Sequence, residues 1–389
     1  MMMKKRLAII SSHPIQYNAP LFILLSHSEL IDLKVFYTFS QGKEQVFDKD
    51  FGKQIKWDIP LLEGYSYEFA ENISSRPGLD HFRGIINPGL TKAIAQWKPD
   101  AILVYGWNYH SHLKVMRHFK GRVPVYFRGD STLLDEQGGM KSILRRILLK
   151  WIYSHVDGAF FVGTNNKKYF LAHGFKEEEL FFAPHAIDVR RFSIDKELEE
   201  KATIKREELG IGKDETVILF AGKFEPKKDP LSLVRAFKKH EKAGVRLLLV
   251  GNGILEDELR KLAGNDRRIL FLPFQNQSAM PAVYAMADLF VLPSQGPGET
   301  WGLAVNEAMA AGKAILASNK VGCSADLIRE GRNGYVFEAG NLTDLEKKLS
   351  DLLSSTDILR EMGRNSREMI SSWSYEHVCK SIVDQVTKT

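Results

Sequence analysis

Two glutamates, Glu299 and Glu307, stand in a glycine-rich segment that follows the apolar stretch Leu289–Leu292. Gly298 and Gly302 let the backbone pass close to a ligand, and the free N–H groups of a helix that opens near Gly302 favour an anion. Carboxylates accept hydrogen bonds from hydroxyl groups, so two of them beside an anion suit a hydroxyl-rich ligand. Taken alone, the segment fits equally well a loop-to-helix connection with a solvated acidic face.

A second group of charged residues follows the apolar stretch Val217–Ala221. Lys223 and Lys228 come shortly after this stretch ends. The carboxyl end of a strand in a doubly wound sheet borders the crevice where such sheets bind ligands. Two ammonium groups there can neutralise a pyrophosphate and stabilise it as it leaves, while we interpret Lys227 as a solvated neighbour. Lysines for phosphates and glutamates for hydroxyls together favour a nucleoside diphosphate sugar as the ligand.

Short apolar stretches alternate with amphipathic helical patterns along almost the whole chain. Helical patterns cover Pro88–Trp97 and Ser142–His155, for example. Such alternation predicts right-handed parallel units and an α/β fold with doubly wound sheets. The expected strands are Leu7–Ser11, Leu33–Thr38, Ala101–Tyr105, Val123–Phe127, Gly158–Gly163, Val217–Ala221, Val245–Val250, Ile269–Leu272, Leu289–Leu292 and Ala314–Ala317.

The strand pattern stops and restarts once. The charged stretch Asp195–Glu208 carries no strand signal, so we expect the domain boundary near it. We predict two Rossmann-like domains that face a central cleft, over residues 1–192 and 193–372. Two charged surface helices are expected within residues 343–370, and a last amphipathic segment follows over residues 373–389.

These motifs, in this order, resemble those of the GT-B glycosyltransferases of family 4, which use nucleotide sugars with retention of anomeric configuration. The glutamate segment carries the resemblance together with Gly222, Lys223 and Lys228 after their strand. Three shorter motifs extend it over nearly the whole chain: Gly251-Asn252-Gly253, Pro184-His185-Ala186-Ile187-Asp188 and Ala287-Asp288 ahead of Pro293-Ser294. The resemblance implies a GT-B fold in which a helix in residues 373–389 packs back on the first domain.

The resemblance also implies roles for residues of the second domain. Lys223 and Lys228 would hold the diphosphate, and Glu299 would bind hydroxyls of the transferred sugar. Glu307 would hold the ribose. Relatives usually have arginine where Lys223 stands, so a bidentate phosphate contact becomes a point charge here. The other donor-binding candidates are Gly222 and Gly251, Phe274 near the base, and Gly298, Thr300, Trp301, Gly302 and Leu303 near the phosphate.

The first domain departs from the family pattern. Its first loop, residues 12–20, lacks a usual pair of glycines and resembles a subgroup that acts on bacterial surface glycans. The acceptor-side candidates in this loop are His13, Gln16, Tyr17 and Asn18. Many relatives place a catalytic-centre histidine after the strand equivalent to Val123–Phe127, where this chain has Arg128-Gly129-Asp130-Ser131. Arg128, Asp130 and His110 remain alternatives for that catalytic role.

The reaction implied by the resemblance is transfer of a sugar from a UDP- or GDP-sugar to a glycan or lipid-linked acceptor, in the synthesis of lipopolysaccharide, O-antigen or capsule. Attack on the same face, with the departing phosphate taking the acceptor proton, requires no covalent nucleophile, metal or other cofactor. Two other functions stay open. One is a nucleotide-sugar 2-epimerase of the same fold, which needs acid–base groups beside the sugar, and the other is a non-catalytic nucleotide- or glycan-binding protein.

Composition excludes several classes of protein. Only Cys323 and Cys379 are cysteines among 389 residues, which excludes a disulfide scaffold or zinc ribbon and fits the reducing cytoplasm. No apolar run reaches the roughly 18 residues of a membrane span, and we expect no signal peptide.

We interpret Asp48-Lys49-Asp50 as a solvated loop rather than a metal motif. Gly251-Asn252-Gly253 lacks the third glycine of a dinucleotide fingerprint, which disfavours a dehydrogenase.

The net charge of +6 is too small to indicate a nucleic-acid partner, but it is unevenly distributed. Residues 191–389 sum to zero, so the excess lies in the first domain, which suits an anionic or membrane-associated acceptor. The segment Lys141–Tyr153 joins four basic residues to an apolar face. We expect the apolar face to pack on the sheet and the basic face to contact an anionic bilayer peripherally, at about 1 kcal/mol per basic residue.

Overall fold

The computed structural model describes residues 3–40, 46–48, 53–55 and 57–388, and the chain forms two compact units. Unit 1 comprises Met1–Val46, Ile59–His185 and Tyr375–Thr389, and unit 2 comprises Phe47–Asp58 and Ala186–Ser374. The division falls at His185, a few residues before the expected boundary. In the sequence Asp48-Lys49-Asp50, Lys49 and Asp50 lie outside the described residues.

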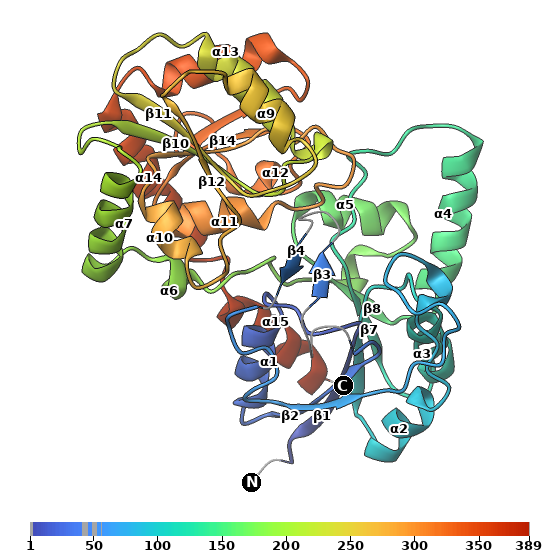
Figure 1. Ribbon diagram of the computed structural model, residues 1–389. Helices are drawn as coiled ribbons and strands as arrows, with labels where there is room; N and C mark the ends of the chain where they lie inside the picture. The colour runs from blue at the N-terminus through green and yellow to red at the C-terminus, as the bar shows by residue number, and fades with distance from the viewer. Residues whose placement is uncertain (1–2, 41–45, 49–52, 56, 389) are drawn as a thin grey trace. The chain divides into compact units, whose positions relative to one another are not determined.

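Unit 1 is built on a seven-stranded sheet in which every neighbouring pair of strands is parallel (Figure 1). The order is β5-β2-β1-β6-β7-β8-β9. Because both faces are covered, the central strands are continuous apolar runs, as the sequence pattern predicted. The strands are β1 (Lys5–Ser11), β2 (Ile31–Tyr37), β5 (Ser66–Phe69), β6 (Ala101–Tyr105), β7 (Val125–Arg128), β8 (Gly158–Phe161) and β9 (Leu180–Phe182).

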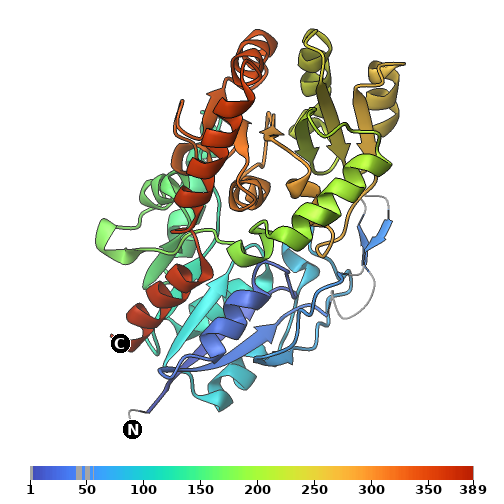
Figure 2. The same cartoon turned by 90° about the vertical axis from the view of Figure 1, so that its left-hand side faces the viewer.

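Helices cover both faces of this sheet. The C-terminal helix α15 (Tyr375–Thr387) packs beside α1 (Ala19–Ser26), and it also contacts β1 and β9 (Figure 2). The other face buries apolar residues of four helices in one core with those of the strands. These helices are α2 (Leu90–Trp97), α3 (His110–Phe119), α4 (Met140–Tyr153) and α5 (Thr164–Ala172).

Helix α4 differs from the expectation that its apolar face packs on the sheet. Only Leu149, Ile152 and Tyr153, near its C-terminal end, are buried. The rest of the apolar face is not covered by any part of the chain that the structure describes, because only the last turns of α4 reach the unit 1 core. Its exposed side chains are Met140, Ile143, Leu144, Ile147, Leu148 and Trp151, at 44% to 71% of their surface.

Unit 2 is built on a six-stranded parallel sheet in the order β12-β11-β10-β13-β14-β15. Its strands are β10 (Thr216–Ala221), β11 (Val245–Val250), β12 (Ile269–Leu272), β13 (Leu289–Leu292), β14 (Ala314–Ser318) and β15 (Gly334–Phe337). The short strands β3 (Val46–Asp48) and β4 (Lys53–Ile55) pair with each other.

One face of the unit 2 sheet buries apolar side chains of α8 (Pro230–Lys238), α9 (Glu256–Ala263) and α13 (Leu342–Leu352). Helix α11 (Leu303–Ala310) contacts β13 and β14, and it packs against α10 (Met280–Ala285) and α14 (Thr356–Ile370). The stretch expected to mark the boundary forms α7 (Lys196–Glu208) inside unit 2, after α6 (Val189–Phe192). Helix α12 (Ser324–Leu327) completes the unit.

Candidate functional site

The charged and glycine-rich motifs of unit 2 meet at the carboxyl edge of its sheet. The segments after β10 and β13 lie side by side because these two strands pair in parallel. Strands β11 and β12 continue the sheet on the other side of β10. The lysine segment, Gly251-Asn252-Gly253, Phe274 and the glutamate segment therefore each follow one of four adjacent strands, at the edge where doubly wound sheets bind ligands.

Lys228, in the segment after β10, contacts Glu299, in the segment after β13. The Lys228 ammonium forms an ion pair with Oε2 of Glu299, and Ser294 Oγ donates to the same oxygen over 3.0 Å. The Glu299 residue is only 7% exposed. A carboxylate so deeply buried is stable only when it is paired or hydrogen-bonded, and these partners fix it in position.

Gly302 shapes the start of α11. Its φ of +94° is a left-handed conformation, which glycine adopts at little cost. A Cβ atom there would lie 2.8 Å from Cγ1 of Val321 and 3.1 Å from Cδ2 of Leu292, so only glycine fits. The first N–H groups of a helix have no partner within it and attract negative charge. The start of α11 thus offers backbone donors near Glu299, which stands three residues before Gly302.

Glu307 lies within α11 and is 4% exposed. The Tyr284 hydroxyl donates to its Oε2 over 2.8 Å. Nearby, the indole Nε1 of Trp301 donates to Oδ1 of Asn306 over 2.8 Å, and the Trp301 ring packs on Trp373 at 5.3 Å between centroids. These contacts fix the segment that carries Thr300, Trp301 and Leu303 relative to the helix.

Two glycines allow β10 and β11 to continue into closely packed loops. A Cβ on Gly251 would lie 2.0 Å from the Gly222 carbonyl oxygen, and a Cβ on Gly253 would lie 2.4 Å from that of Phe224. Oδ1 of Asn252 accepts the backbone N–H of Phe274 over 2.9 Å, which ties the loop after β12 to this edge. The positions expected to line the phosphate and base subsites are therefore joined by backbone contacts.

The lysines after β10 differ in their partners. Lys228 is buried against Glu299, with 18% of its side chain exposed. Lys227 pairs instead with Glu225 at 3.4 Å and is 39% exposed. Lys223 is half-buried and follows Gly222. Lys227 is thus the more exposed of the two adjacent lysines.

Arg128 and Asp130 lie at the carboxyl edge of the unit 1 sheet. Arg128 ends β7 and is 7% exposed, and its guanidinium donates to the carbonyl oxygens of Ala183 and Pro184 over 2.8 and 3.0 Å. Its side chain thus holds the segment after β9. Oδ2 of Asp130 lies 4.0 Å from Nε2 of His185, the next residue of that segment. Burial lowers the pKa of His185 to about 4.

His110 is not part of this cluster. It is the first residue of α3, and its ring packs against Phe82 at 6.0 Å between centroids. It lines a cavity of about 510 Å³ with Lys114 and Arg117. His112, two residues on, is fully buried, and it bonds to the Thr38 hydroxyl and to the Tyr105 and Gly106 carbonyl oxygens.

The first loop of unit 1 lies between β1 and α1. His13 Nδ1 contacts the Ser12 hydroxyl at 3.0 Å, and burial lowers the pKa of His13 to about 4. The Tyr17 carbonyl oxygen accepts the Tyr375 hydroxyl over 2.9 Å, which connects the loop to α15. Gln16 and Asn18 are half-buried, and Asn18 precedes the first residue of α1.

No role was predicted from the sequence for His185, Tyr284 or Asn306. His185 stands in a motif that matched the family, so its type and position were visible, but its approach to Asp130 depends on the pairing of β8 with β9. Tyr284 reaches Glu307 from α10, a helix with no charged residue to mark it. In the described residues, no group of three or more His, Cys, Asp or Glu side chains could hold a metal ion.

Part of unit 2 matches a known protein family in sequence. Residues 201–369 match the family model described as glycosyl transferases group 1. A D-inositol 3-phosphate glycosyltransferase of Nocardia farcinica is 32% identical over 191 residues, which are 46% of this chain and 42% of that protein. A lipopolysaccharide 1,2-N-acetylglucosaminetransferase of Salmonella typhimurium is 30% identical over 202 residues, 46% of this chain and 50% of that one. The chain thus spans about half the length of these curated relatives.

The likeness in structure extends over the whole chain. HepE of Anabaena, solved in complex with UDP, superposes with a TM-score of 0.76 at 18% identity, covering all of both chains. This similarity confirms the expected fold, with its two Rossmann-like units.

Proposed function

We propose that this protein, whose residues 201–369 match the glycosyl transferases group 1 model, moves a sugar from a nucleoside diphosphate sugar to a hydroxyl group of a glycan or lipid-linked acceptor. The observation that carries the proposal is the contact of Lys228 with Glu299 beside the start of α11. It sets a cation, a buried carboxylate and the N-terminal end of a helix at one sheet edge. A sugar diphosphate requires these three kinds of partner.

In this proposal each part of the nucleotide sugar binds to a different part of the site. Lys223, Lys228 and the first N–H groups of α11 bind the diphosphate, and Glu299 accepts hydrogen bonds from hydroxyls of the transferred sugar. Glu307 accepts hydrogen bonds from the ribose, because a carboxylate has about four lone-pair sites and can accept from a ribose hydroxyl as well as from Tyr284. The base lies near Phe274. HepE, with the same fold, was solved with UDP, which supports a uridine or similar nucleotide here.

The lysines act on the leaving group. As the bond between the sugar and the diphosphate breaks, negative charge grows on the phosphate oxygens, and two ammonium groups stabilise it. The acceptor oxygen then bonds to the anomeric carbon on the face that the diphosphate leaves, and its proton passes to the departing phosphate. Configuration is retained without a covalent intermediate, and no metal or other cofactor takes part.

Unit 1 supplies the acceptor side in this proposal. The clustered Arg128, Asp130 and His185, and the loop that carries His13, lie at the carboxyl edge of its sheet. His185 is the best replacement for the missing family histidine, because its depressed pKa keeps it neutral near pH 7 and able to accept a hydrogen bond from an acceptor hydroxyl.

The acceptor is associated with a membrane. Helix α4 exposes an apolar face next to the basic side chains Lys141 and Arg145, which suits a helix that lies in the surface of an anionic bilayer. The Arg117 guanidinium lies 5.6 Å from the centre of the Trp151 ring, so this face continues to the basic cavity on α3. No helix in the described parts of the chain is long and apolar enough to cross a membrane. We assign the protein to the cytoplasmic side of the membrane, in synthesis of a surface polysaccharide, and the name of the Salmonella relative supports this assignment.

Product analysis tests the proposed reaction. Purified protein is incubated with UDP- and GDP-sugars, with and without membrane-extracted glycolipid acceptors, and the products are separated by mass spectrometry. Transfer predicts release of the nucleoside diphosphate together with an acceptor one sugar heavier. An epimerised nucleotide sugar formed without acceptor would instead show a 2-epimerase. Binding of a nucleotide sugar with neither transfer nor hydrolysis would show a non-catalytic protein.

A further inference from the structure

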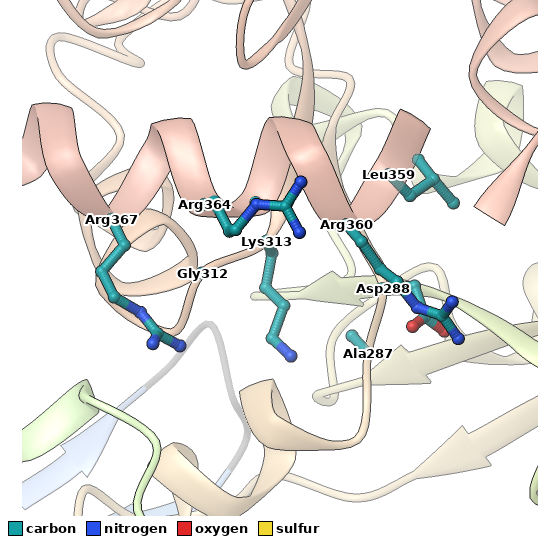
Figure 3. Close-up of a pocket in the computed structure, with 9 residues that line it drawn as sticks. Ala287, Asp288, Gly312, Lys313, Leu359, Arg360, Arg364 and Arg367 are labelled. Atoms are coloured by element: carbon teal, nitrogen blue, oxygen red, sulfur yellow. The ribbon is translucent and has the colours of Figure 1, made fainter. Parts of the chain in front are cut away.

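A cavity of about 290 Å³ opens at the amino edge of the unit 2 sheet, away from the donor site (Figure 3). Asp288 and Lys313 border it just before β13 and β14 begin, whereas the donor loops follow the carboxyl ends of the same strands. A strand rises about 3.3 Å per residue, so the four residues of β13 keep the two edges roughly 13 Å apart. A volume of about 290 Å³ is large enough for about ten waters at ~30 Å³ each, and so for a small anion.

The lining of this cavity is strongly basic. Lys313, Arg360, Arg364 and Arg367 face one carboxylate, that of Asp288. Oδ2 of Asp288 already accepts the backbone N–H of Val217 over 2.8 Å. In Figure 3 the Lys313 side chain extends between those of Arg360 and Arg367. An anion is the ligand that such a lining requires.

Lys313 is 8% exposed, and its ammonium reaches one carbonyl oxygen, that of Ala285, at 3.4 Å. An ammonium has three donors, so this single long contact leaves a buried charge poorly compensated. The burial lowers the pKa of Lys313 to about 8. Asp288 and Glu199 oppose this lowering, whereas Arg367 and Arg206 add to it. Arg206 donates to the Met286, Gly212 and Glu215 carbonyl oxygens.

The arginines form one stripe on α14. Positions 360, 364 and 367 lie on the same face of a helix, where like charges repel one another. Arg360 forms an ion pair with Asp357, with Nη1 3.2 Å from Oδ1. No ion pair in the described residues involves Arg364 or Arg367. A bound anion would remove the repulsion within this stripe.

Two glycines hold this stripe against the turn before β14. A Cβ on Gly363 would lie 2.1 Å from the Gly312 carbonyl oxygen, so α14 rests directly on that turn. A Cβ on Gly312 would lie 2.8 Å from Nη2 of Arg367, so the guanidinium packs flat over the glycine. The Arg367 guanidinium is therefore held in place before any ligand arrives, which lowers the entropy cost of binding.

We infer that this cavity is a second binding site, separate from the donor site, for a small phosphate-bearing anion. The guanidinium groups of Arg364 and Arg367 give it bidentate contacts, and Lys313 gives it a point charge. A free phosphate compound and the phosphate of a larger molecule share this chemistry.

Calorimetry with inorganic pyrophosphate tests the site, in protein saturated with UDP so that the donor site is filled. We expect one pyrophosphate bound per chain, and a loss of affinity of at least about tenfold in R364A/R367A. Arg267→Ala removes an exposed arginine of unit 2 outside the cavity and serves as the matched control. Circular dichroism verifies that each variant is folded, and Arg364→Ala alone serves if the double variant is not.

Equal affinity in R364A/R367A, R267A and the wild type would overturn the inference, as would the absence of any pyrophosphate binding to the UDP-saturated protein. Glycerol phosphate and anionic vesicles then separate the two sources of the ligand. Competition by glycerol phosphate indicates a free compound, and competition by vesicles alone indicates a lipid headgroup.

Discussion

The ion pair between Lys228 and Glu299 is the residue contact on which the proposed donor site depends. Both residues were selected from the sequence because each follows an apolar strand, and the glycines around them suited a close ligand. Their contact was not predictable, because it requires β10 and β13, which are far apart in sequence, to be neighbours in the sheet. The same holds for Asp130 and His185, which only the folded chain brings to 4.0 Å.

Replacing Lys228 by alanine should lower kcat/KM for sugar transfer at least about a hundredfold, since loss of one group that stabilises charge in a transition state costs roughly 3 kcal/mol. Glu307→Ala is expected to abolish transfer as well. Lys227→Ala is the matched control, because Lys227 is exposed and pairs with Glu225. Steady-state kinetics with one donor and acceptor measure the effect. Near-normal turnover in the Lys228 and Glu307 variants would refute the site.

His112 should make unit 1 less stable in acid. Burial lowers its pKa from 6.5 to about 4, so the unfolded chain binds more protons than the folded one between these values. The full contribution of this group to the free energy of unfolding is therefore present above pH 6.5 and is lost as the pH falls toward 4. At pH 5 the loss is about 2 kcal/mol.

Urea unfolding at pH 7 and pH 5 measures this dependence. In His112→Asn the difference between the two pH values should shrink by that amount, whereas the exposed His27 can be replaced by asparagine as a control without such a change. An unaltered pH dependence in His112→Asn would show that the group does not control acid stability.

At the scale of elements, the apolar stretches predicted the central strands to within a few residues, because buried parallel strands are continuous apolar runs. Five strands of three or four residues in the described parts of the chain were not predicted: β5, β9 and β15, which lie at sheet edges, and β3 and β4, which pair with each other. Segments so short carry no periodicity, and their neighbours in the sheet determine that they are strands. The prediction for helix α4 was wrong in another way, since amphipathicity alone does not show whether an apolar face packs on the sheet or stays exposed.

Membrane binding by α4 is expected to depend on its exposed apolar side chains. Each large apolar side chain that enters a bilayer contributes about 1.5–3 kcal/mol, so L144S/I147S should weaken binding at least tenfold. Ile204→Ser is the matched control, because Ile204 is 55% exposed on α7. Sedimentation with phosphatidylglycerol vesicles measures the binding, and K141A/R145A should weaken it without affecting the weaker binding to phosphatidylcholine. Equal sedimentation of L144S/I147S and the wild type would contradict this role of α4.

At the scale of the whole molecule, composition and the order of motifs were enough to predict a two-unit α/β protein. The chain returns to unit 1 for its last helix, α15, which packs beside α1. That return was inferred from the resemblance and not from any pattern in residues 373–389. The uneven charge, +6 in residues 1–190 and zero in the remainder, now has a structural context, because the basic side chains of α3 and α4 surround an exposed apolar face.

The most direct test of the donor site is calorimetry with UDP, GDP and ADP on the wild type, K228A and E307Q. We predict that at least one of these three nucleotides binds the wild type at one molecule per chain. The expected Kd is in the micromolar range, which corresponds to a binding free energy of about −8 kcal/mol. Both variants should weaken that binding at least tenfold, because each removes a charge-assisted contact. Failure of all three diphosphates to bind, or unchanged affinity in both variants, would contradict a nucleotide-sugar site at this edge of the sheet.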